Sequence, residues 1–85
     1  MTARLNVELC GRLAEACGRM VELDLPEEEV PVSVMFTALA AAYPSLAPSI
    51  ASGRVRACVN EALVGPDSPV RAGDEVALFP PVSGG

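Results

Sequence analysis

The stretch "PVSVMFTALAAAYP", residues 31–44, carries the main helical pattern of this 85-residue chain. Its apolar side chains recur at the spacing i, i+3, i+4, i+7 and i+11, which forms one stripe along an α-helix. The stripe consists of Val32, Met35, Phe36, Leu39 and Tyr43. Pro31 suits a first helical position, and Pro44 ends the helix. The pattern predicts one main helix that packs its apolar stripe across a sheet.

Alternating apolar and polar residues predict strands before and after this helix. These strands cover residues 4–9, 20–25, 55–59, 62–64 and 75–79. Glycines at 11 and 18 bracket a short helical turn, so we expect the first two strands to form an antiparallel pair. The crossover through the helix lets the last strand lie parallel to the first. The fold class is therefore α+β, with a mixed sheet of four to five strands and one main helix packed on one face.

The remaining segments have no clear period and are expected to be irregular. "PEEEVP" (26–31) is predicted to be a solvated loop, because three adjacent acids in a loop have no reason to converge on an ion. "GPDSPVRAGD" (65–74) is rich in turn residues, and Asn60-Glu61 can turn one strand back on the next. "PSLAPSIASG" (44–53) is predicted to be a connection that Leu46 and Ile50 anchor to the core.

The charge and cysteine content exclude several classes of function. A net charge of −5, from eleven acids against six arginines, argues against nucleic acid and anionic membranes, and favours a basic cleft on a protein partner. The absence of histidine removes the usual general base, so we expect no enzyme activity from the chain alone.

The chain has three cysteines, Cys10, Cys17 and Cys58, without a CxxC motif or a leader peptide. This predicts a cytoplasmic protein whose thiols stay reduced. We expect the thiols to pack as small side chains and to form no metal site.

The C-terminal segment "FPPVSGG", residues 79–85, is the strongest candidate for a functional site. Strand alternation turns Phe79 outward, where it can anchor a partner or, alternatively, cap the sheet edge. Pro80 and Pro81 end the strand pairing and favour an extended exit, and Val82 supplies one apolar contact. We therefore expect a domain at 1–79 followed by an extended tail at 80–85.

Small residues at the end of this tail suit a narrow channel. Ser83, Gly84 and Gly85 allow close backbone approach on all sides. The terminal carboxylate, with a pKa of ~3.3–3.7, is ionised at neutral pH and can attack the α-phosphate of ATP. A sulfur donor can convert the resulting anhydride into a thiocarboxylate. The alternative is an inert end, since chain termini are often rich in small residues.

The segments "NVELCGRLAEACG", "VPVSVMFTALAAAYP", "RACVNEALV" and "GDEVALFPPVSGG" resemble, in order, those of the small subunit of molybdopterin synthase. The resemblance implies a ubiquitin-like β-grasp fold and a sulfur carrier for molybdenum-cofactor biosynthesis. A partner adenylyltransferase, which consumes the ATP, would activate Gly85, and a sulfur donor protein would supply the sulfur. The large synthase subunit, in a heterotetramer of two small and two large chains, would accept the tail (Phe79 to Gly84) and pass the sulfur to precursor Z. No cofactor would bind the carrier itself.

Two positions depart from the family pattern, and three alternatives to this function stay open. Ala14 stands where members often carry an arginine before the glutamate matching Glu15, and Asn60-Glu61 replaces the usual Asn-Gly. The first alternative is a thiocarboxylate carrier for thiamine or cysteine synthesis, although the double proline favours molybdopterin synthase. The second is a ubiquitin-like protein modifier. The third is an interaction domain with an inert tail.

Overall fold

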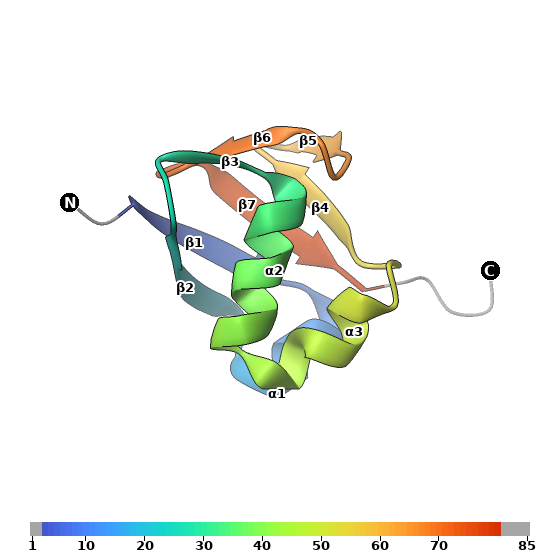
Figure 1. The fold of residues 1–85 in the computed structure, drawn as a ribbon. Coiled ribbons are helices and arrows are strands. Elements are labelled where there is room, and N and C mark those ends of the chain that lie inside the picture. The colour runs from blue at the N-terminus through green and yellow to red at the C-terminus, as the bar shows by residue number, and fades with distance from the viewer. Residues whose placement is uncertain (1–2, 81–85) are drawn as a thin grey trace.

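A mixed five-stranded sheet crossed by helix α2 forms the centre of the computed structural model, which describes residues 3–80 (Figure 1). The strand order is β2-β1-β7-β4-β5. These strands are β1 (Ala3–Leu9), β2 (Met20–Leu25), β4 (Arg56–Val59), β5 (Ala62–Val64) and β7 (Glu75–Phe79). The predicted α+β class and the predicted mixed sheet are confirmed.

The first and last strands lie side by side at the middle of the sheet, as the crossover predicted. β1 and β7 run parallel, with Val7 opposite Val76 and Leu9 opposite Leu78. The other neighbouring pairs, β1–β2, β4–β7 and β4–β5, are antiparallel. β7 is therefore held by backbone hydrogen bonds on both sides up to the point where the tail begins.

The core lies between α2 (Val32–Ala42) and the inner face of the sheet. Val32, Met35 and Leu39 are fully buried, and Phe36 packs against the same core while partly exposed. Pro31 ends a strand and caps the helix, so helical residues begin one position later than predicted. Apolar burial of this kind contributes about 25 cal/mol per Å² and is the main stabilising contribution in a chain so short.

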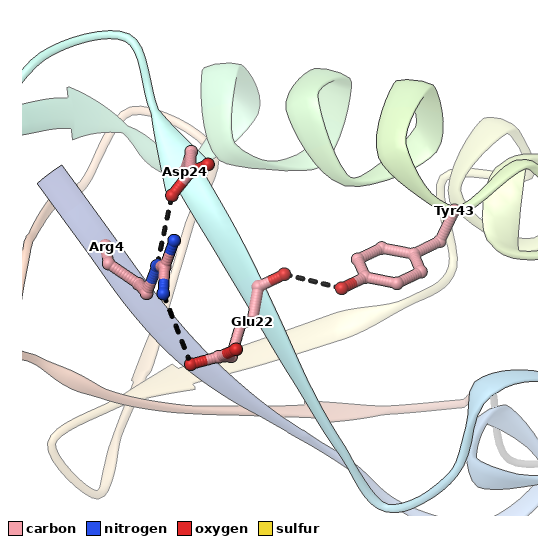
Figure 2. Close-up of polar contacts among 4 residues, drawn as sticks. All are labelled: Arg4, Glu22, Asp24 and Tyr43. Atoms are coloured by element: carbon pink, nitrogen blue, oxygen red, sulfur yellow. Dashed lines mark hydrogen bonds and ion pairs between the residues drawn. The ribbon is translucent and has the colours of Figure 1, made fainter. Parts of the chain in front are cut away.

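Polar contacts tie the end of α2 and the edge strand β2 to the rest of the sheet (Figure 2). Tyr43 lies one residue beyond the helix, and its hydroxyl donates to the backbone carbonyl of Glu22. On the outer face of the sheet, Arg4 Nε donates to Asp24 Oδ1 at 3.2 Å, and its guanidinium lies 3.7 Å from Glu22 Oε2. This hydrogen bond and the charge of Asp24 raise the pKa of Arg4, which stays a cation. Exposed pairs like these stabilise a fold only weakly.

The prediction of irregular structure was wrong in two segments that pair with each other. β3 (Glu29–Pro31) pairs antiparallel with β6 (Pro69–Arg71), and Val30 and Val70 face each other in the core. Glu29 also lies 3.3 Å from Arg71. Each strand has three residues and a proline, so neither carries a local strand pattern. The pairing joins segments about forty residues apart and is stabilised by burial rather than by propensity.

The connection after the main helix is more regular than predicted. It contains the 3-10 helix η2 (Pro44–Leu46) and helix α3 (Ala47–Ala51). Leu46 is buried and Ile50 packs against the core, which confirms both anchors. The short helical turn predicted between β1 and β2 is also confirmed, as the 3-10 helix η1 (Gly11–Leu13) and helix α1 (Ala14–Cys17).

The hairpin between β4 and β5 turns at Asn60 and Glu61, which have positive φ angles of 50° and 70°. Two positive angles are what a tight hairpin turn requires, so Glu61 adopts the conformation that glycine usually supplies. The Asn60 side chain also fixes this turn to β7, because its Oδ1 accepts from the Glu75 N–H at 3.0 Å. The departure at this turn thus leaves the hairpin intact.

Taken one at a time, the helices of residues 3–80 are too short to cross a membrane. Only α2 and the segment Pro44–Ala51 taken together have the length and apolar composition of a membrane span, and the chain bends by 119° between them.

Candidate functional site at the root of the tail

β7 sets the direction in which the chain leaves the sheet. Val76 and Leu78 are buried against the core, whereas Phe79 is 40% exposed on the outer face. The predicted outward orientation of Phe79 is therefore confirmed. The backbone N–H of Cys10 donates to the Leu78 carbonyl at 3.0 Å, which extends the β1–β7 pairing to the end of β7. The tail thus starts from a central, fully paired strand.

An outer apolar strip, made of Phe79, Ala77, Cys58 and Leu63, lies next to this exit. The strand register places Cys58 opposite both Ala77 and Leu63, so the strip runs across β7, β4 and β5. Leu63 is 64% exposed and belongs with Phe79 to the large apolar side chains that residues 3–80 leave in solvent. Exposed aromatic and aliphatic groups on one face are typical of a docking surface.

Leu63 was not singled out from the sequence. The available signal was the alternation in Ala62–Val64, which sets Leu63 on the face opposite to its two neighbours. That signal does not reveal that Leu63 and Phe79 share a face, because the sharing depends on the register of two further strands.

Pro80 rests against the loop that follows β1. It is half-buried, and a Cβ built on Gly11 would lie 3.2 Å from Pro80 Cγ. Gly11 also has a φ of +56°, which disfavours any side chain at that position. The absence of a side chain at Gly11 therefore lets the first tail residue sit close to η1.

We expect Gly11→Ala to lower both the free energy of unfolding of the domain and the rate of the activation predicted for Gly85. The left-handed backbone costs about 1–2 kcal/mol for a residue with a Cβ, and the methyl group must displace Pro80. Urea denaturation measures the first effect, and the rate of tail activation by a partner enzyme measures the second.

Gly73→Ala is the matched control, because Gly73 has a φ of +89° and a Cβ at that position would have no heavy atom within 4 Å other than those of Gly73 and its two chain neighbours. It should lower stability while leaving tail activation unchanged. Equal activation rates for Gly11→Ala and Gly73→Ala would show that the contact with Pro80 does not position the tail.

The predicted packing role of the cysteines is confirmed for Cys17, which packs against the core, whereas Cys58 lies in the outer apolar strip. All three are free and half-buried. Burial, reinforced by the Glu8 carboxylate, raises the pKa of Cys10, so this thiol stays protonated at neutral pH and reacts slowly. Cys17 Sγ lies 3.2 Å from Ser45 Oγ. Across residues 3–80 no three potential ligands come together as a metal site.

The other predicted site residues, namely Pro81, Val82, Ser83, Gly84 and Gly85, lie outside the described residues. The structure thus places Phe79 and Pro80 together at the root of the tail. The chemistry predicted for Gly85 and the extended form predicted for 80–85 stay predictions.

Comparisons with known proteins agree with this architecture. A family model described as the ThiS family matches residues 7–85. The molybdopterin synthase sulfur carrier subunit of Escherichia coli (strain K12) is 51% identical over 37 residues, which are 44% of this chain and 46% of that protein. The match therefore spans just under half of that curated relative.

Two solved structures share the whole fold. SAMP1 from Haloferax volcanii superposes with a TM-score of 0.80 at 31% identity and covers 96% of this chain and 99% of its own. The small archaeal modifier protein 1 of Methanosarcina acetivorans, at 24% identity and a TM-score of 0.76, covers 100% and 99% and supports the fold alone. With these neighbours the sheet and helix are those of a ubiquitin-like β-grasp fold.

Proposed function

The chain belongs to the ThiS family, and from this premise we propose that it is the sulfur-carrier subunit of a molybdopterin synthase. The observation that carries the proposal is the extent of the family match, which runs to Gly85 and so includes the tail. The partial match at 51% identity to a molybdopterin synthase sulfur carrier subunit is the observation that directs the proposal to molybdopterin synthesis. The fully paired β7, leading directly into the tail, is the support that such a role requires.

In the proposed reaction the Gly85 carboxylate acts first as a nucleophile. One of its oxygens attacks the α-phosphate of ATP, the bond to the β-phosphate breaks, and pyrophosphate leaves. Sulfide, or the equivalent delivered by a persulfide donor and a reductant, then adds to the acyl-adenylate carbonyl and displaces AMP. The product is a C-terminal thiocarboxylate, which donates its sulfur to precursor Z on the large subunit.

The chain's own part in this scheme is to present and dock the tail. We propose three protein partners: the adenylyltransferase, the sulfur donor and the large synthase subunit, the last in a heterotetramer with two copies of each chain. The outer apolar strip, with Phe79 and Leu63, is the surface we assign to docking. ATP is bound by the adenylyltransferase, and the carrier is not an enzyme alone.

Intact-mass spectrometry tests the proposal directly. The purified chain is incubated with ATP, sulfide and a molybdopterin-pathway adenylyltransferase. We expect a mass gain equal to the exchange of one oxygen for sulfur, lost again when the large subunit and precursor Z are added. A carrier charged with sulfur but not discharged by precursor Z would instead indicate thiamine or cysteine synthesis. A mass that never changes would contradict the sulfur-carrier role.

A protein modifier is the second candidate, because SAMP1 of Haloferax volcanii, named as a small archaeal modifier, is 31% identical over almost the whole chain. In that role the activated Gly85 would form an isopeptide bond with a lysine of another protein. The chain has no lysine and cannot link to itself in this way. Covalent adducts of the chain on many cellular proteins, seen after trypsin as residues 72–85 attached to lysines, would favour the modifier, and a thiocarboxylate without such adducts favours the carrier.

We expect Phe79→Ala to weaken binding to the large subunit by roughly tenfold or more, as for an exposed aromatic anchor. Met20→Ala is the control, because Met20 is 59% exposed but lies on β2 at the far edge of the sheet. Isothermal titration calorimetry with each variant measures the dissociation constants. Identical constants for Phe79→Ala and the unmodified chain would remove Phe79 from the interface.

A further inference from the structure

We propose that a positively charged groove at the root of the tail docks a carboxylate-rich segment of the adenylyltransferase, an inference that rests on the proposed function. The tail-root groove has a volume of about 760 Å³ and lies between η1, α1 and the η2–α3 segment. Its lining includes Arg12, Ser45, Ser49, Ser52, Arg54 and Pro80. Figure 1 shows the end of β7 on the same side of the molecule as α3.

Charge is divided between the two ends of the molecule. The end where β7 finishes holds four arginines and two acids, a net charge of +2: Arg12, Arg19, Arg54 and Arg56 against Glu8 and Glu15. The rest of the chain holds Arg4 and Arg71 against the other nine acids, a net charge of −7, so the two parts add to −5. The overall charge predicted a basic cleft on the partner, but the tail end has the opposite sign and attracts anions.

The arginines of the groove are available for a partner. The ion pairs found within residues 3–80 use Arg4 and Arg71, at the other end of the molecule. Arg12 and Arg54 are exposed. The Ser52 hydroxyl accepts from the Arg54 N–H at 3.2 Å and donates to the Ser49 carbonyl at 2.6 Å, which fixes the backbone on which Arg54 stands. Glu15 also lines the groove, so two guanidinium groups face one carboxylate.

The position of the groove favours a protein segment over a nucleotide. ATP reacts at the Gly85 carboxylate, and five residues separate Pro80 from that end. An adenylyltransferase that encloses the whole tail also contacts Pro80, where the tail begins. Pro80 is part of the groove lining, so the surface of that enzyme reaches the groove. Arginine forks bind carboxylates through paired hydrogen bonds, and serine hydroxyls at the rim can donate to the same segment.

Charge reversal in the groove tests the inference. Arg12→Glu with Arg54→Glu is compared with Arg4→Glu with Arg71→Glu, which changes the net charge by the same amount at the other end. The measurement is pyrophosphate release by the adenylyltransferase at increasing carrier concentration. We expect the groove variant to raise the KM about tenfold with kcat unchanged, and the control to change it less than about twofold. High salt should reduce the difference, because it screens exposed charges.

Nuclear magnetic resonance with defined probes shows whether the groove binds a peptide or a phosphate compound. A synthetic glutamate-rich peptide should shift the amide signals of Ser45, Ser49 and Arg54, and a glutamine-rich peptide of equal length should not. Inorganic phosphate or ATP shifting these signals at lower concentration than the glutamate peptide would overturn the choice of a protein segment.

The experiments distinguish between an error in the docking site and an error in the proposed carrier function. If the unmodified chain is charged with sulfur and the groove variant keeps the same KM, the groove is not a docking site and the carrier function stands. If the unmodified chain gains no thiocarboxylate, the carrier function is wrong. The groove can then still be tested with the glutamate-rich peptide, because the amide shifts that it causes should be absent in the groove variant.

Discussion

Adding one alanine after Gly85 should abolish thiocarboxylate formation and molybdopterin synthesis while leaving the free energy of unfolding unchanged. The extra residue adds roughly 3.3–3.6 Å to the reach of the chain and moves the carboxylate by that distance. A displacement of about 1 Å in a reacting group can lower a rate about a hundredfold, so we expect a loss beyond that factor. Intact-mass spectrometry after incubation with ATP, sulfide and the adenylyltransferase measures it.

The control for this extension is one alanine added before Met1, which lengthens the chain equally at the other terminus. That variant should be charged with sulfur at the rate of the unmodified chain, and urea denaturation should give the same stability for all three proteins. Normal pterin synthesis by the C-terminal extension would show that the terminal carboxylate is not the reacting group. The proposed function would then be wrong.

Leu78→Ala should lower the free energy of unfolding by about 3–4 kcal/mol, the largest stability effect we expect from a single substitution near the site. Leu78 is 1% exposed and lies on β7, with paired strands on both sides, so little relaxation can fill the cavity. Domains of this size are stable by about 5–15 kcal/mol, so the variant loses a large share of its margin. Chemical denaturation followed by circular dichroism measures the change.

The neighbouring substitution Phe79→Ala is the matched comparison for Leu78→Ala. Phe79 is on the same strand but faces solvent, so its loss should cost less than about 1 kcal/mol of stability while weakening partner binding. Leu78→Ala should bind normally once folded at low temperature. A similar loss of stability in both variants would mean that Phe79 packs as a core residue and does not serve as an anchor.

The sequence patterns that gave correct predictions are those in which buried residues recur at a regular spacing within a single helix or strand. The i, i+3, i+4, i+7 stripe identified α2, and period-2 alternation identified β1, β2, β4, β5 and β7. Alternation along β7 also gave the outward direction of Phe79, because successive side chains of a strand point to opposite faces. The tail, a short motif with a chemical reason for each residue, pointed to the family whose model extends to Gly85.

The features that could not be predicted depend on contacts between distant segments. β3 and β6 are strands because Val30 and Val70 are buried against each other, although each segment alone reads as a loop. The close approach of Gly11 to Pro80, and the shared face of Leu63 and Phe79, follow from the register of separate strands.

Composition and one-dimensional periodicity thus determined the fold class and the main helix and singled out the tail as the candidate site, because each leaves a repeat or a motif in consecutive residues. Tertiary packing alone established the charge at the tail root. The sequence has a net charge of −5, yet folding gathers Arg12, Arg54 and Arg56 around the end of β7 and leaves most acids at the opposite end. An electrostatic field depends on where charges lie in space, and a sum over the chain does not contain that information.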